Sequence, residues 1–151
     1  MGAEGQLVLE GLATTAGSFH LGPVDLQVGA GEVLVVLGPS GAGKTTLLDT
    51  IAGFRPPLAG RVQLAGRDIT SAPPEQRGIG VVFQHAALFP HLSVRENLRF
   101  GPRARGEDRR PQLEELLARF GLVDHADRRP RSLSGGERQR VALARALAND
   151  P

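Results

Sequence analysis

Residues 38–46 read GPSGAGKTT and match the pattern G-x-x-x-x-G-K-[ST] at each of its fixed positions. Glycines let such a loop wrap with its backbone N–H groups pointing inward, and a helix that begins after the loop adds the positive end of its dipole. The stretch therefore predicts a phosphate cradle, made by Gly38, Pro39, Ser40, Gly41, Ala42, Gly43, Lys44, Thr45 and Thr46.

Lys44 is the only lysine among the 18 basic residues of the chain, and every other one is arginine. A compact, mobile ammonium can reach the β- and γ-phosphates from a tight loop, where the planar fork of arginine fits less well. The hydroxyl of Thr45 is the group that such loops offer to Mg²⁺. A chance match in a glycine-rich turn is the plainer interpretation. The pattern of a buried strand before the loop and of an amphipathic helix after it argues against chance. We therefore expect the loop to bind a nucleoside triphosphate with Mg²⁺.

The residues around the loop predict an α/β fold, with strands mostly in the first half of the chain and helices in the second. Residues 33–37, VLVVL, are typical of a strand buried on both faces. Leu47, Leu48 and Ile51 share one face of the helix that follows the loop. Further strands are expected at 7–9, 24–28, 61–64 and 79–83, helices from Ser93, from Pro111 and over 134–148, and an irregular arginine-rich linker over 101–111.

Composition and charge exclude several classes of protein. The chain has no cysteine, so neither a disulfide nor a thiolate metal site can form. A pI near 10.3 accompanies a formal net charge of only +2, and no basic stripe is interleaved with aromatic residues, so nucleic-acid binding is not expected. The N-terminus lacks the pattern of a secretory signal, and residues 33–37 are too short to cross a bilayer. We expect a cytoplasmic protein that reaches a membrane only through a partner.

A second motif, LSGGERQ, occupies residues 133–139. Ser134 and Glu137 have the spacing of a capping box, so the simplest interpretation is a well-started helix. That interpretation explains Gly135 and Gly136 poorly, because glycine costs about 1 kcal/mol within a helix. Two glycines in the first turn expose backbone N–H groups at a positive helix end, which favours an anion-binding site.

With the phosphate loop, this motif resembles the signature of ATP-binding-cassette (ABC) ATPases, and the resemblance covers the whole chain. Phe83-Gln84 is similar to the Q-loop of the family, residues 92–97 to the segment after it, and residues 138–148 to the helix after the signature. The resemblance implies an α/β fold with a P-loop NTPase core, an antiparallel β subdomain and a helical subdomain. It divides a single, truncated ABC ATPase domain over 1–151 into core plus β subdomain (1–92), helical subdomain with signature (93–137) and return to the core (138–151).

The resemblance also implies roles for individual residues. Lys44 and Gln84 would be catalytic, and Thr45 and Gln84 would contact Mg²⁺. ATP would be held by the nine residues of the loop, while the signature of one subunit would contact ATP held by the other in a head-to-tail dimer. These contacts in trans fall on Ser134, Gly135, Gly136 and Glu137, although Glu137 and Gln139 are better explained as cap and solvent-facing residues than as catalysts.

Two features depart from the family pattern. The family stacks adenine on an aromatic residue, but the chain has no Tyr or Trp, and the simplest register places Thr15 there. Phe19 is the nearest aromatic candidate, and it could equally fill the core. The chain also lacks the family's strand with an Asp and a Glu and the later switch histidine, since His85, His91 and His125 precede the signature. We expect an N-terminal portion of a longer ATPase that, alone, hydrolyses ATP near background.

Several further segments are in the style of bacterial importer subunits that serve thiamine, molybdate or tungstate, polyamines or ferric iron. These include IAGF at 51–54, PPEQR at 73–77 and ALFPHLSVRENL at 87–98. The implied partners are a second ATPase subunit, forming a homodimer, transmembrane permease subunits and, indirectly, an extracytoplasmic solute-binding protein, with the chain peripheral on the cytoplasmic face of the inner membrane. The alternatives are a soluble, non-transport ABC ATPase and a remnant that binds nucleotide without hydrolysis.

Overall fold

The structure is a computed structural model that describes residues 6–104, 106 and 110–149. The chain divides between Ile79 and Gly80 into two compact units, and each is described by itself.

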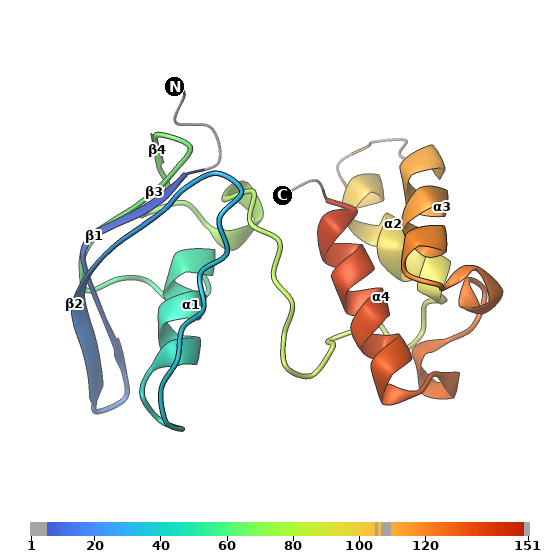
Figure 1. The fold of residues 1–151 in the computed structure, drawn as a ribbon, viewed down its shortest axis with the longest axis horizontal. Helices are drawn as coiled ribbons and strands as arrows, with labels where there is room; N and C mark the ends of the chain where they lie inside the picture. The colour runs from blue at the N-terminus through green and yellow to red at the C-terminus, as the bar shows by residue number, and fades with distance from the viewer. Residues whose placement is uncertain (1–5, 105, 107–109, 150–151) are drawn as a thin grey trace. The chain divides into compact units, whose positions relative to one another are not determined.

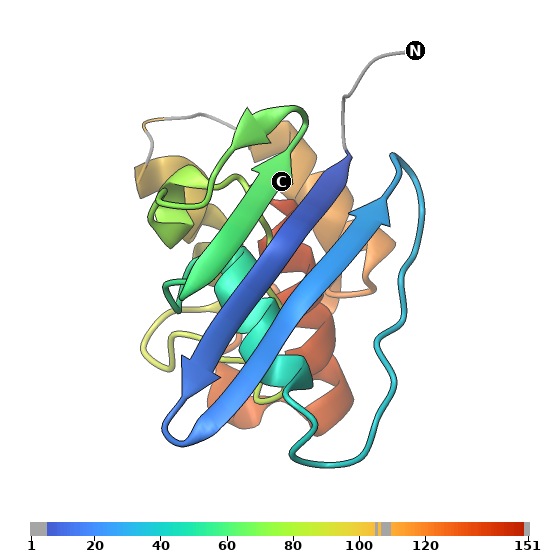
Figure 2. The same ribbon diagram turned by 90° about the vertical axis from the view of Figure 1, so that its left-hand side faces the viewer.

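The first unit contains a four-stranded antiparallel sheet with the order β2-β1-β3-β4. Figure 2 shows its strands face-on, with helix α1 behind them. Leu9 of β1 lies opposite Leu26 of β2 on one side and opposite Val62 of β3 on the other, so apolar residues of three strands meet in one row. The strands are β1 (Leu7–Ala16), β2 (Phe19–Val28), β3 (Ala59–Leu64) and β4 (Arg67–Asp68).

Helix α1 (Lys44–Ala52) packs against this sheet (Figure 1) and directly follows the phosphate loop. Leu47 and Ile51 are buried against Leu9, Leu12 and Val62, which closes a core between helix and sheet. Leu48, expected on the same face, is 55% exposed, because the buried stripe of this short helix is narrower than the apolar pattern predicted.

The C-terminal end of α1 is held by a buried arginine. Arg77, which follows the 3-10 helix η1 (Pro74–Gln76), donates from Nη1 to the carbonyl oxygens of Thr50 and Ile51, at 3.0 and 2.8 Å. It also donates to the carbonyl oxygens of Thr70 and Ala72. Burial lowers the pKa of this guanidinium. A cation at a helix C-terminus interacts favourably with the helix dipole, so Arg77 ties α1 to the segment after β4.

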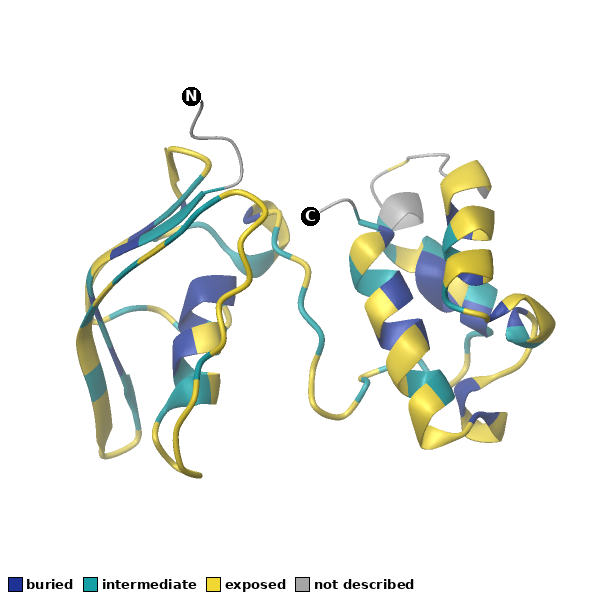
Figure 3. Cartoon of the chain, in the orientation of Figure 1, coloured by how far each residue is buried: buried dark blue, intermediate teal, exposed yellow. Residues whose placement is uncertain are grey.

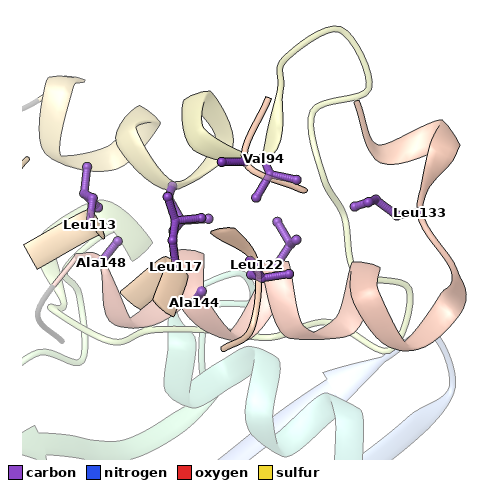
Figure 4. Packing of buried hydrophobic residues seen from close by; sticks show 10 residues of the cluster. Val94, Leu113, Leu117, Leu122, Leu133, Ala144 and Ala148 are labelled. Carbon is purple, nitrogen blue, oxygen red and sulfur yellow. The ribbon is translucent and has the colours of Figure 1, made fainter. Parts of the chain in front are cut away.

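The second unit is helical and has its own core. Figure 4 shows apolar residues from its helices and from the turns between them converging, among them Val94, Leu117, Leu122 and Ala144, all of which are almost completely buried. Figure 3 shows buried and exposed residues alternating along α4, as an amphipathic helix requires. The elements are α2 (Val94–Ala104), α3 (Arg110–Arg119), η2 (Val123–His125), η3 (Pro130–Ser132) and α4 (Gly135–Leu147).

A buried amide anchors the segment that leads into α2. The Asn97 side chain is fully buried, accepts the N–H of Phe89 and donates to the carbonyl oxygens of Phe89, Leu92 and Ser93. One side chain therefore contacts four backbone groups of this segment, and the Phe89 N–H and the Leu92 carbonyl among them lie outside any helix or strand.

Most expectations that depend on short-range patterns are confirmed. Ser93 and Glu96 form the expected capping box at the start of α2, and Leu113 and Leu117 of α3 are buried as the spacing predicts. The helix expected over 134–148 is α4 with its two caps. The prediction of an irregular linker over 101–111 is wrong at both ends, since α2 continues to Ala104 and α3 begins at Arg110. Residues 105 and 107–109 lie outside the described residues.

The two expected strands at 33–37 and 79–83 are wrong. Neither segment forms a strand, and Val33, Val35 and Leu37 are 89%, 68% and 85% exposed. A strand buried on both faces needs a hydrogen-bonded neighbour along each edge. Within the described residues only four strands pair, and none of them lies beside these segments.

The fold is thus α/β, with an antiparallel β part carrying the P-loop helix and a helical part carrying the second motif. The finer division at residues 92 and 137 stays a prediction. In the part of the chain that the structure describes, no helix has the length and apolar character needed to span a membrane.

Candidate functional site

The phosphate loop leads into α1, whose N-terminus carries no side-chain cap. Gly41 and Gly43 have φ angles of 84° and 87°, in the left-handed region that favours glycine. Gly43 is the N-cap residue, and no side chain caps it. Because the first N–H groups of a helix have no partner within the helix, those of Lys44, Thr45 and Thr46 are free to bind an anion at the positive end of α1.

Lys44 is half-buried, and its ammonium is folded back over the loop. Its Nζ donates to the carbonyl oxygens of Gly38 and Pro39, at 2.8 and 2.7 Å. An ammonium has three protons, so one remains for a ligand oxygen. These two hydrogen bonds hold the positive charge beside the uncapped N–H groups.

Phe19, the first residue of β2, lies against the loop. A Cβ atom added to Gly43 would be 2.7 Å from Cε1 of Phe19 and 3.2 Å from Cδ1 of Leu21. Phe19 is 37% exposed and is not a member of the buried core of its unit. Of the two alternatives open from sequence, the position beside the loop favours contact with a ligand over core filling.

The second motif forms the capped N-terminus of α4. Ser134 Oγ accepts the N–H of Glu137, and Glu137 Oε2 accepts the N–H of Ser134 at 2.6 Å. The hydrogen bond with the Ser134 backbone lowers the pKa of the Glu137 carboxyl most, and the hydrogen bond with the Ser134 side chain lowers it further. Cβ atoms added to Gly135 or Gly136 would meet nothing nearer than 3.9 Å, so the exposed first turn leaves room for a ligand.

Gln84 is exposed and lies in a segment without helix or strand, between Gly80 and Ser93. The structure thus brings Phe19 together with the phosphate loop in the first unit, while Gln84 and the signature residues lie in the second. The roles of these residues stay predictions.

Two functional candidates were missed from sequence. His125 Nε2 lies 3.2 Å from Oε1 of Glu137, and Arg145 of α4 donates to the carbonyl oxygen of Ala87 with its guanidinium 5.5 Å from the centre of the Phe89 ring. Burial lowers the pKa of Arg145. His125 and Glu137 are 12 residues apart in sequence, and Arg145 is 58 residues from Ala87 and 56 from Phe89. No short-range pattern therefore signals either contact.

The residues fit a nucleotide phosphate better than a protein-held metal cluster. The uncapped start of α1 and the Lys44 ammonium suit phosphate oxygens. Among the described residues, no group of three or more His, Cys, Asp or Glu side chains could hold a metal ion. Mg²⁺ needs no such cluster when phosphate oxygens and water supply most of its ligands, and the exposed Thr45 could add its hydroxyl.

The chain is similar to one known protein family and to several named proteins. A protein-family profile described as ABC transporter matches residues 21–151. The chain is 52% identical over 134 residues to the spermidine/putrescine import ATP-binding protein PotA of Nitratidesulfovibrio vulgaris, covering 85% of this chain and 36% of that protein. It is 46% identical over 148 residues to the molybdate/tungstate import ATP-binding protein WtpC of Thermococcus kodakarensis, covering 96% of this chain and 45% of that protein.

A third relative is the sulfate/thiosulfate import ATP-binding protein CysA of Mycobacterium bovis, 50% identical over 131 residues, with 85% of this chain and 37% of that protein covered. Among solved structures, MJ1267, an ATP-binding cassette of an ABC transporter, aligns with a TM-score of 0.84 and 30% identity over 97% of this chain and 66% of that chain. This chain spans less than half the length of the curated relatives named here.

Proposed function

Because the chain belongs to the ABC transporter family, we propose that the whole protein is the ATP-binding subunit of an ABC importer, which couples ATP binding and hydrolysis to solute transport. The observation that carries the proposal is the phosphate loop, where the Lys44 ammonium is held by two carbonyl oxygens beside the uncapped start of α1. The importer part rests on the resemblance to import ATP-binding proteins at 46% to 52% identity.

In this proposal the first unit binds the triphosphate. The N–H groups at the start of α1 hold phosphate oxygens, and the third proton of Lys44 adds a charged hydrogen bond to them. Thr45 would hold Mg²⁺, which when bound offsets the negative charge of the phosphates during phosphoryl transfer to water. The Phe19 ring would stack on the base, and Gln84 would orient water and Mg²⁺.

The signature would act on the nucleotide of a second copy of the chain. Ser134 and Glu137 close the start of α4 through reciprocal hydrogen bonds, and Gly135 and Gly136 leave its first turn exposed. A positive helix end that is open to solvent favours a phosphate from outside the chain. We infer a head-to-tail homodimer in which each nucleotide lies between one P-loop and the other subunit's signature.

The partners would be transmembrane permease subunits, with the protein peripheral on the cytoplasmic face of the membrane and a solute-binding protein acting indirectly from outside. The three relatives are named for polyamines, sulfate or thiosulfate, and molybdate or tungstate, so we propose a small charged solute.

Disrupting the gene in its natural host and measuring uptake of radiolabelled putrescine, sulfate and molybdate tests the transport proposal. We expect uptake of one of these solutes to fall and to recover when the parent gene is restored, but not when it carries Lys44→Ala. Unchanged uptake of all three, together with sensitivity to DNA damage, would instead favour a soluble, non-transport ATPase.

A further inference from the structure

The Glu137 carboxylate uses both of its oxygens. Oε2 accepts the Ser134 N–H at 2.6 Å, which closes the capping box, and Oε1 faces His125 Nε2 at 3.2 Å. The two side chains are only 20% and 23% exposed, so solvent competes weakly for this contact. The capping box alone needs only one carboxylate oxygen, and His125 therefore adds a second restraint.

The backbone around His125 fixes where its ring can lie. Its N–H donates to the carbonyl oxygen of Leu122 at 3.0 Å, and its own carbonyl oxygen accepts the N–H of Arg128 at 2.9 Å. Leu122 and Ala126 on either side are buried in the core of the helical unit. The imidazole is thus carried by a rigid turn rather than by a free loop.

The ring nitrogens make no competing contact in the part of the chain that the structure describes. Nδ1 is buried and has no hydrogen-bond partner there, whereas Nε2 faces the Glu137 carboxylate. A buried polar atom without a partner costs free energy, so Nδ1 does not restrain the ring and the contact with Glu137 does.

We propose that His125 is a positioning residue for the signature, holding the Glu137 carboxylate so that the Ser134 cap stays closed. The role of the signature in binding nucleotide rests on the proposed function, but the contact itself does not.

Charged groups of α4 and of the segment that carries His125 lie near the pair. From α4, Arg140 acts on the Glu137 carboxylate together with His125, and both favour its ionised form. On the segment that carries His125, Asp124 is exposed, and Asp127 lies 3.6 Å from Nε of Arg95 in α2. The Glu137 charge lies in the first turn of α4, where the helix dipole favours a carboxylate.

NMR of the ¹⁵N-labelled full chain tests the proposal without nucleotide. The measurement is hydrogen exchange at the Ser134 amide. His91→Gln, which removes an exposed imidazole from the same unit, is the control and should exchange like the parent. Glutamine can still donate to Glu137, so hydrogen exchange at the Ser134 amide should match the parent in His125→Gln and accelerate about fivefold in His125→Phe.

Hydrogen exchange at the Ser134 amide that is equally slow in the parent and in His125→Phe, or as fast in His125→Gln as in His125→Phe, would overturn the proposal. If His125→Phe does not give a dispersed spectrum, His125→Leu, which also removes the donor to Glu137, takes its place. Because no nucleotide is added, failure here is distinct from failure of the transport proposal, which shows in solute uptake.

Discussion

The ring of Phe19 lies against Gly43, so that a methyl group added to this glycine would meet Cε1 at 2.7 Å. The contact joins the first residue of β2 to the N-cap residue of α1, 24 positions later. The loop therefore needs glycine at position 43 for two reasons. The φ angle of 87° is left-handed, and an aromatic ring fills the space that a side chain would occupy.

Gly43→Ala should therefore disturb the loop more than backbone strain alone would. We expect a loss of about 1–3 kcal/mol in the free energy of unfolding and at least about a tenfold loss in ATP affinity. Gly31→Ala is the matched control, since its φ angle is 75° and nothing lies within 4 Å of the added Cβ. Urea unfolding and equilibrium titration measure both effects, and equal losses in the two variants would argue against a role of the Phe19 contact.

Phe19→Ala should separate base stacking from phosphate binding. If the ring stacks on adenine, its loss should lower ATP affinity about five- to tenfold while affinity for inorganic tripolyphosphate stays the same. Phe100→Ala, which removes an exposed phenyl group of the other unit, is the control. Equal losses for ATP and tripolyphosphate would mean that Phe19 supports the loop and does not contact the base.

Short-range determinants made the loop and the helical unit predictable from sequence. The motif of the loop, the capping boxes at Ser93 and Ser134, and the spacing of Leu113 and Leu117 each depend on residues within a few positions of one another. Such signals act on local backbone geometry and on one helix face, so they hold whatever else surrounds them.

Contacts between distant residues could not be predicted in the same way. The strands expected at 33–37 and 79–83 depend on neighbours in space, and the contacts of His125 with Glu137 and of Arg77 with Thr50 join residues 12 and 27 positions apart. The buried position of Arg77 has no short-range signal, because an arginine in a polar segment is ordinarily exposed.

Arg77→Met should destabilise the first unit. Methionine keeps much of the volume but leaves the carbonyl oxygens of Ile51, Thr70 and Ala72 without the Arg77 donor, so we expect a loss of about 2–4 kcal/mol in the free energy of unfolding. Arg67→Met, at an exposed position, should change it by less than about 0.5 kcal/mol. Similar urea midpoints for the two variants would contradict this role of Arg77.

Glu137 should make stability depend on pH on the acid side. Hydrogen bonding to Ser134 lowers its pKa in the folded chain below the ordinary 4.5, so its contribution is present above that value and is lost as the pH falls through the lowered pKa. Between about pH 5 and pH 3 the parent should therefore lose more stability than Glu137→Gln. Glu75→Gln, at an exposed site, should follow the parent, and parallel curves for all three proteins would show that the cap contributes nothing.

The central claim is that the loop over 38–46 binds a triphosphate through Lys44. Equilibrium titration of Mg-ATP into the parent, Lys44→Ala and Lys44→Arg tests this claim most directly. We predict that Lys44→Ala loses at least about tenfold in affinity, because a charged hydrogen bond is worth about 1.5–3 kcal/mol, and that arginine does not restore it. Far-ultraviolet circular dichroism should show all three folded alike. Equal affinity for Mg-ATP in the parent and Lys44→Ala would contradict the account.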